Sequence, residues 1–202
     1  MAQAFRAVVG RKAEDQWESL LSKIVDGGLH DGDRVLDVGC GVGRASIAVA
    51  SRARGVRIDA MARTAVEAAH ARSQIRREHL DRRVVVRVST GALPFDDETF
   101  EAALSIDSSL PLVDAPDLLA EVFRVLRSGG SLYLRWHSAS WLVSTVTDGS
   151  VAEASVTALE RAGFVVSAVA RTCATTSLVR RPPRRRFEPA VVATWELRAT
   201  KA

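Results

Sequence analysis

Residues 37–43 combine an acid with three glycines at alternate positions, in the order DVGCGVG. Glycine lacks a Cβ, so the backbone can turn sharply at these positions and allow a ligand to approach closely. The helical pattern that follows would point unpaired N–H groups and the positive end of its dipole at such a ligand. The segment therefore predicts a nucleotide-binding turn between a strand and a helix. A glycine-rich turn without a ligand is the alternative interpretation.

The spacing of the glycines narrows the kind of nucleotide. Dinucleotide-binding turns follow G-x-G-x-x-G, whereas this chain has G-x-G-x-G, with Arg44 at the place of the third dinucleotide glycine. The acid, Asp37, stands two residues before the first glycine. This combination argues against a dinucleotide.

A second acid, Asp59, follows Asp37 by 22 residues and is expected to end the second strand. A carboxylate at that place can accept hydrogen bonds from both hydroxyls of a ribose. It could instead serve as an acid near the N-terminus of the next helix, where the dipole favours a negative charge. The two roles are compatible.

The elements that must position these residues alternate between strand and helix, which favours a parallel sheet covered on both faces. The first 30 residues are predicted to form a helical cap, and 31–202 a single domain. Strands are expected over 33–38, 55–59, 84–88, 100–106, 131–136, 164–170 and 190–197, and helices over 43–53, 62–78, 115–127 and 150–163. The last two strands are predicted to form an antiparallel hairpin.

Composition limits the class of protein. The 202 residues are 47% hydrophobic, and no apolar run approaches the ~20 residues of a membrane span. The first apolar segment is short and broken by Arg6, so we expect no signal peptide and a cytoplasmic protein. Two cysteines and four scattered histidines offer no metal-ligand spacing, so no metal is expected. The net charge of +4 is compatible with an acidic substrate, a nucleic acid or an acidic carrier protein.

Four segments in order resemble the class I S-adenosylmethionine-dependent methyltransferases. They are DVGCGVG at 37–43, GVRIDA at 55–60, LPFDDETF at 93–100 and EVFRVLRSGG at 121–130. The chain is most similar to small-molecule enzymes of the ubiquinone/menaquinone C-methyltransferase type, over about residues 30–135. The resemblance implies a Rossmann-like, doubly wound α/β fold whose seven-stranded sheet is mostly parallel with a C-terminal antiparallel hairpin. It also implies S-adenosylmethionine as cofactor and a small molecule as acceptor.

The resemblance implies a set of cofactor-binding residues. The glycine turn would meet the aminoacyl part of the cofactor, and Asp37 its amino group. Where relatives carry an acid for the adenine amino group, this chain has Ser89, whose hydroxyl accepts a hydrogen bond without charge assistance. The full set is Asp37, Gly39, Cys40, Gly41, Gly43, Asp59, Ala60, Ser89, Thr90, Gly91 and Ile106.

Two residues are candidates for handling a proton. Asp107 follows the fourth strand and is the acid nearest to the expected methyl group, and His137 follows the fifth strand. A histidine found in relatives after the fourth strand is replaced here by Pro111. His137 beside Trp136 could equally be a structural residue. Methyl transfer depends mainly on positioning, so no dedicated base is strictly required.

Alternatives to a small-molecule enzyme remain at this point. The basic charge allows an RNA or protein methyltransferase, although residues 105–108 read SIDS in place of an adenine-methylation motif. The serine at position 89 also allows a scaffold protein that binds the cofactor without turnover. The acceptor pocket would be open, closed by the N-terminal helix, or completed by a second subunit in a homodimer.

Overall fold

The computed structural model describes residues 17–89, 91–108, 112–140, 150–180 and 187–202. Within these ranges the backbone alone is described at 137–140, 150–152, 170–180 and 187–195. Of the predicted N-terminal cap, a helical segment at 17–25 is described. The division into cap and domain stays a prediction.

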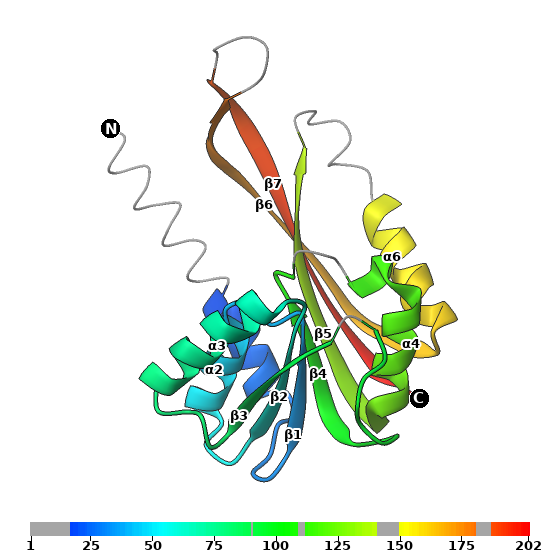
Figure 1. The fold of residues 1–202 in the computed structure, drawn as a ribbon. Coiled ribbons are helices and arrows are strands. Elements are labelled where there is room, and N and C mark those ends of the chain that lie inside the picture. The colour runs from blue at the N-terminus through cyan, green and yellow to red at the C-terminus, as the bar shows by residue number, and fades with distance from the viewer. Residues whose placement is uncertain (1–16, 90, 109–111, 141–149, 181–186) are drawn as a thin grey trace.

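One seven-stranded sheet organises the molecule, in the order β3-β2-β1-β4-β5-β7-β6 (Figure 1). The strands from β3 to β5 in this order pair in parallel, whereas β7 runs antiparallel to both of its neighbours. The strand order reverses between β1 and β4, and such a switch point opens a crevice at the carboxyl ends of the strands. The predicted fold class is confirmed. The strands are β1 Arg34–Val38, β2 Arg57–Ala62, β3 Val84–Val88, β4 Phe100–Ile106, β5 Leu126–Ser140, β6 Phe164–Arg180 and β7 Phe187–Lys201.

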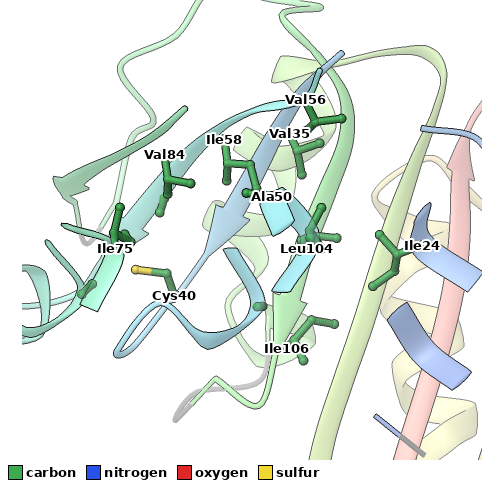
Figure 2. Close-up of a cluster of buried hydrophobic side chains, with 14 of the residues drawn as sticks. Ile24, Val35, Cys40, Ala50, Val56, Ile58, Ile75, Val84, Leu104 and Ile106 are labelled. Atoms are coloured by element: carbon green, nitrogen blue, oxygen red, sulfur yellow. The ribbon is translucent and has the colours of Figure 1, made fainter. Parts of the chain in front are cut away.

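Helices cover both faces of this sheet. The segment 17–25, α2 (Arg44–Arg52) and α3 (Ala65–Arg77) pack on one face through a cluster that Figure 2 shows in close-up. On the other face, α4 (Pro116–Val125) and α6 (Ser150–Arg161) contribute to a second cluster around Phe100. A 3-10 turn, η1 (Leu112–Asp114), leads into α4. Burial of apolar side chains on both faces supplies most of the free energy that holds such layers together.

The second strand ends later than predicted. It continues through Ala62, which is paired with Val88 of β3, so Asp59 lies within the strand and not at its end. The following helix begins after Thr64, whose hydroxyl accepts a hydrogen bond from the Glu67 N–H at 3.1 Å. This T-x-x-E signal of a helix N-terminus is present in the sequence and places the boundary correctly.

Other boundaries also differ from the prediction. The fourth helix stops at Val125, and β5 begins directly at Leu126. The last two strands reach Arg180 and begin at Phe187, well beyond the short hairpin expected from local pattern. Pairing between β6 and β7 runs from Phe164 opposite Lys201 to Arg180 opposite Phe187, and this long-range pairing supports their extra length.

Candidate functional site

A pocket of about 370 Å³ lies where the carboxyl ends of β1, β2, β3 and β4 meet the start of α4. Its walls mix apolar side chains with serines and two charged residues. Three of the predicted cofactor residues, Gly39, Ser89 and Gly91, line this pocket. The other lining residues are Val38, Met61, Arg63, Leu93, Ser105, Ser108, Leu112, Ala115, Pro116, Asp117 and Leu118.

The glycine turn has the backbone that its sequence requires. Gly39, Gly41 and Gly43 have φ angles of 75°, 53° and 86°, in the left-handed region that side chains disfavour. The N–H groups of Gly39 and Cys40 donate to the Met61 carbonyl at 2.9 and 3.0 Å, which ties the turn to β2. A Cβ on Gly39 would lie 2.5 Å from the Ser108 hydroxyl oxygen, whereas one on Gly41 would meet nothing within 4 Å. The turn is therefore closely packed on its pocket side.

Asp37 lies in the sheet beneath this turn. It is fully buried and is not among the residues that line the pocket. The Ser46 hydroxyl donates to its Oδ2 at 2.5 Å. Burial raises the pKa of Asp37 to about 6, against the lowering effect of hydrogen bonds from the Ser46 side chain and backbone. The carboxyl group thus links β1 to the first turn of α2. Its predicted contact with a cofactor amino group stays a prediction.

Asp59 is engaged by two arginines on the sheet. Its Oδ2 accepts from Arg34 Nη2 at 2.8 Å, and its Oδ1 lies 3.4 Å from Arg87 Nη2. The two guanidinium groups lie over the rings of Phe100 and Phe95, at 5.0 and 5.6 Å from their centres. Asp59 is not among the residues that line the pocket. Its predicted ribose contact is untested, but the premise of a strand-end position is wrong.

Three further predicted residues belong to the core. Cys40, Ala60 and Ile106 pack in the first cluster, and Figure 2 shows Cys40 and Ile106 there. Burial, together with the nearby charges of Asp37 and Glu67, raises the pKa of the Cys40 thiol to about 12. The thiol is therefore protonated and unreactive at neutral pH. For these residues, a contact with a cofactor through the backbone stays a prediction.

Ser89 lies on the pocket wall. Its hydroxyl donates to the Ala92 carbonyl at 3.0 Å and accepts a long contact of 3.5 Å from the Gly91 N–H. The side chain is therefore used to shape the turn after β3. Thr90, also predicted to bind cofactor, lies outside the described residues.

A network on α4 holds the turn that begins at Leu93, and sequence reasoning did not assign it. Glu121 accepts from the Leu93 N–H at 2.8 Å, while Arg124 donates to the carbonyls of Leu93 and Phe95 at 3.1 and 2.9 Å. Arg124 also contacts Asp97 at 2.7 Å and Glu121 at 2.8 Å. The hydrogen bond from Arg124, with that from Leu93, lowers the pKa of Glu121 to about 2. The i,i+3 spacing of Glu121 and Arg124 is a local signal that could have identified the pair.

Asp107, the first catalytic candidate, is held by a buried arginine. Arg135 Nε donates to Asp107 Oδ1 at 2.9 Å, and its Nη2 contacts the other carboxylate oxygen. Arg135 also lies over the ring of Trp17 at 4.6 Å, with Arg44 at 4.5 Å from the same ring. An arginine thus competes with any acceptor for this carboxylate, which is not among the residues that line the pocket.

His137, the second catalytic candidate, is placed by its backbone alone. It lies in β5, opposite Thr194 of β7. Its side chain lies outside the described part of the chain, so its role in catalysis stays a prediction.

Two kinds of feature are absent from the described residues. In these ranges, no three His, Cys, Asp or Glu side chains gather so that they could hold a metal ion. Likewise, none of the described helices is long and apolar enough to cross a membrane.

The sheet order, the covering helices and the pocket at the strand ends together make a Rossmann-like fold. Residues 35–130 match the Methyltransf_25 family model, a methyltransferase domain, which confirms the class I methyltransferase predicted for this segment. Among solved structures, a methyltransferase from Bacillus halodurans superposes with a TM-score of 0.70 at 20% identity, over 91% of this chain and 97% of that one. The [4+2]-cyclase SpnF gives a TM-score of 0.68 at 21% identity, over 94% and 82%. At such identities, these likenesses concern the fold alone.

Curated relatives share the same segment. The chain is 35% identical to 24-methylenesterol C-methyltransferase 2 of Oryza sativa over 116 residues, which are 57% of this chain and 31% of that protein. It is 34% identical to methyltransferase GfsG of Streptomyces halstedii over 102 residues, 50% of this chain and 36% of that one. The match thus spans about a third of the length of these relatives.

Proposed function

We propose that this protein is an S-adenosylmethionine-dependent methyltransferase that acts on a small molecule in specialised metabolism. One observation carries the proposal: a left-handed glycine turn borders a pocket of about 370 Å³ at the switch point of a methyltransferase domain. Pockets for small ligands have volumes in this range and lie at such switch points.

The residues present fit a nucleoside cofactor. Gly39 borders the pocket with its backbone alone, and a Cβ there would collide with Ser108, so no larger residue fits this turn. Met61 and Leu93 offer apolar walls for an adenine ring, and Ser89 and Ser105 add hydroxyl groups. The cofactor would supply an activated methyl group on a sulfonium. The protein would contribute positioning and a pocket that excludes water.

Names of relatives support a small and largely apolar acceptor. The curated proteins that match include a squalene methyltransferase, a sterol C-methyltransferase and an erythromycin 3''-O-methyltransferase. One structural neighbour is a geranyl diphosphate methyltransferase. We therefore propose a terpenoid or polyketide acceptor. The narrower likeness to ubiquinone/menaquinone enzymes, a cytoplasmic location and a homodimer stay predictions.

A second candidate is a domain that binds the cofactor without methyl transfer. Two observations favour it: Asp59 and Ser89 already have partners within the protein, and one fold neighbour is described as a cyclase. An RNA or protein substrate has no support beyond the net charge of +4.

A methyl-transfer assay separates these functions. Purified protein is incubated with methyl-labelled S-adenosylmethionine and, in parallel, a sterol, a linear terpenoid, a macrolide, transfer RNA and bulk protein. The proposal predicts label in an extractable small molecule and an equal amount of S-adenosylhomocysteine. Label in RNA or protein would support the rival substrates. Cofactor binding without transfer to any acceptor would support the non-catalytic domain.

A further inference from the structure

At the carboxyl end of β2, the charged residue that lines the pocket is not the acid that the sequence predicted. Side chains on a strand alternate between faces, so Asp59 and Met61 share one face. Met61 and Arg63 line the pocket, whereas Asp59 does not. Each residue of a strand advances the chain by about 3.3 Å, so the acid lies about 6.6 Å back from Met61 along the strand. The charged side chain that reaches the pocket from this end of β2 is therefore an arginine.

Asp59 is also committed elsewhere. The residue is 7% exposed, and its carboxylate accepts a hydrogen bond from Arg34 of β1 and lies near Arg87 of β3. Both arginines rest on aromatic rings, which fixes their positions further. Turning this carboxylate toward a ligand would leave two cations without their partner. Asp59 is best explained as an ion-pair centre that joins the three strands.

Arg63 has the chemistry to replace the acid. It is exposed, it directly follows β2, and it shares the pocket with Asp117 in the first turn of α4. A guanidinium group is a multiple donor, and ribose hydroxyl oxygens accept hydrogen bonds as well as donate them. In dinucleotide sites, an arginine near the ribose-binding acid accommodates a phosphate on the ribose.

We propose that Arg63, and not Asp59, contacts the ribose of the bound nucleoside, so that this pocket presents a donor where an acceptor was expected. The inference rests on the proposed function. It has a consequence that an acid could not produce: the pocket should favour a nucleoside with an anionic group on its ribose. An acid at that place would repel the same group.

Calorimetric titration of the full chain tests this assignment with three probes: S-adenosylhomocysteine, adenosine and adenosine 2'-monophosphate. Removal of a charged donor typically weakens binding by ten-fold or more, so Arg63→Gln should weaken S-adenosylhomocysteine by about that factor. Asp59→Asn should leave the affinity within about three-fold while lowering the melting temperature. Wild-type protein should bind adenosine 2'-monophosphate more tightly than adenosine, and Arg63→Gln should abolish this preference.

The outcomes separate the two proposals. Unchanged affinity in Arg63→Gln, or a preference for adenosine over its 2'-monophosphate, would overturn the assignment of Arg63. If Asp59→Asn fails to fold, the assignment of Arg63 is tested by the affinities of adenosine and adenosine 2'-monophosphate for wild type and Arg63→Gln. No binding of S-adenosylhomocysteine to wild type would overturn the proposed function. A preference for adenosine 2'-monophosphate over adenosine that is lost in Arg63→Gln would, even then, support the contact between Arg63 and the ribose.

Discussion

Asp37 is a buried carboxyl group whose protonation is coupled to the stability of the fold. Burial raises its pKa from 3.8 to about 6 in the folded protein. Because the folded value lies above the unfolded one, the folded state favours the protonated form. The stabilisation is fully present below about pH 4 and is lost as the pH rises through about 6. A shift of this size corresponds to roughly 3 kcal/mol.

An Asp37→Asn variant should remove this dependence. Asparagine keeps the shape of the side chain and stays neutral, so the free energy of unfolding at pH 7.5 should rise by up to about 3 kcal/mol relative to wild type. At pH 4 the two proteins should agree within about 0.5 kcal/mol. Urea denaturation at both pH values measures the difference, with Asp26→Asn at an exposed position as control. Equal stability of Asp37→Asn and wild type at both pH values would contradict a raised pKa.

Single residues show where sequence reasoning works and where it stops. The glycines at 39–43 could be predicted because their requirement is local: a positive φ and a close approach. The partners of Asp59 could not, since Arg34 and Arg87 come from neighbouring strands. The register of β2 against β3 brings Arg87 to the acid, and no local spacing encodes that register.

At the scale of elements, α4 does more than cover the sheet. Its Glu121 and Arg124 hold the backbone of the turn at Leu93 and Phe95, and Leu93 forms part of the pocket wall. The lowered pKa of Glu121 means that its contribution is present above about pH 4.5 and is lost as the pH falls toward 2. Acid should therefore loosen this wall of the pocket.

An Arg124→Ala variant should release the turn. It removes donors from two backbone carbonyls and two carboxylates, and about 1–2 kcal/mol of stability should be lost after allowance for partial exposure. Affinity for S-adenosylhomocysteine should fall several-fold, because Leu93 lines the pocket. Arg127→Ala, at a side chain 57% exposed, is the matched control and should change stability by less than about 0.5 kcal/mol. Equal effects of the two variants on affinity would contradict the role of α4 in shaping the pocket.

The type and order of the helices and strands could be predicted from the sequence better than their first and last residues. The alternation of apolar runs and helical faces indicated the five parallel strands and the covering helices. The predicted β2 ended too early, and the predicted β6 and β7 were too short, because the additional residues are stabilised by pairing with distant strands. The helix α3 was predicted to begin at residue 62 but begins at Ala65, although Thr64 and Glu67 form a local cap that marks this start.

For the whole molecule, the topology brings the glycine turn, the end of β2 and the start of α4 to one pocket. The turn has the left-handed backbone that close approach of a nucleotide requires, while Asp59 and Ser89, two of the predicted cofactor residues, are bonded within the protein. Fold neighbours that include both methyltransferases and a cyclase indicate that the architecture alone does not fix the reaction. Binding of the cofactor is thus the central claim.

Titration of S-adenosylhomocysteine into wild type, Gly39→Ala and Gly41→Ala tests this claim most directly. Both substitutions strain a glycine with positive φ, but a Cβ on Gly39 would collide with Ser108 beside the pocket, whereas one on Gly41 meets open space. We predict one-site binding to wild type, a loss of at least about ten-fold in Gly39→Ala, and a change of only a few-fold in Gly41→Ala. No binding to wild type up to about 1 mM, or equal binding by all three proteins, would contradict the account.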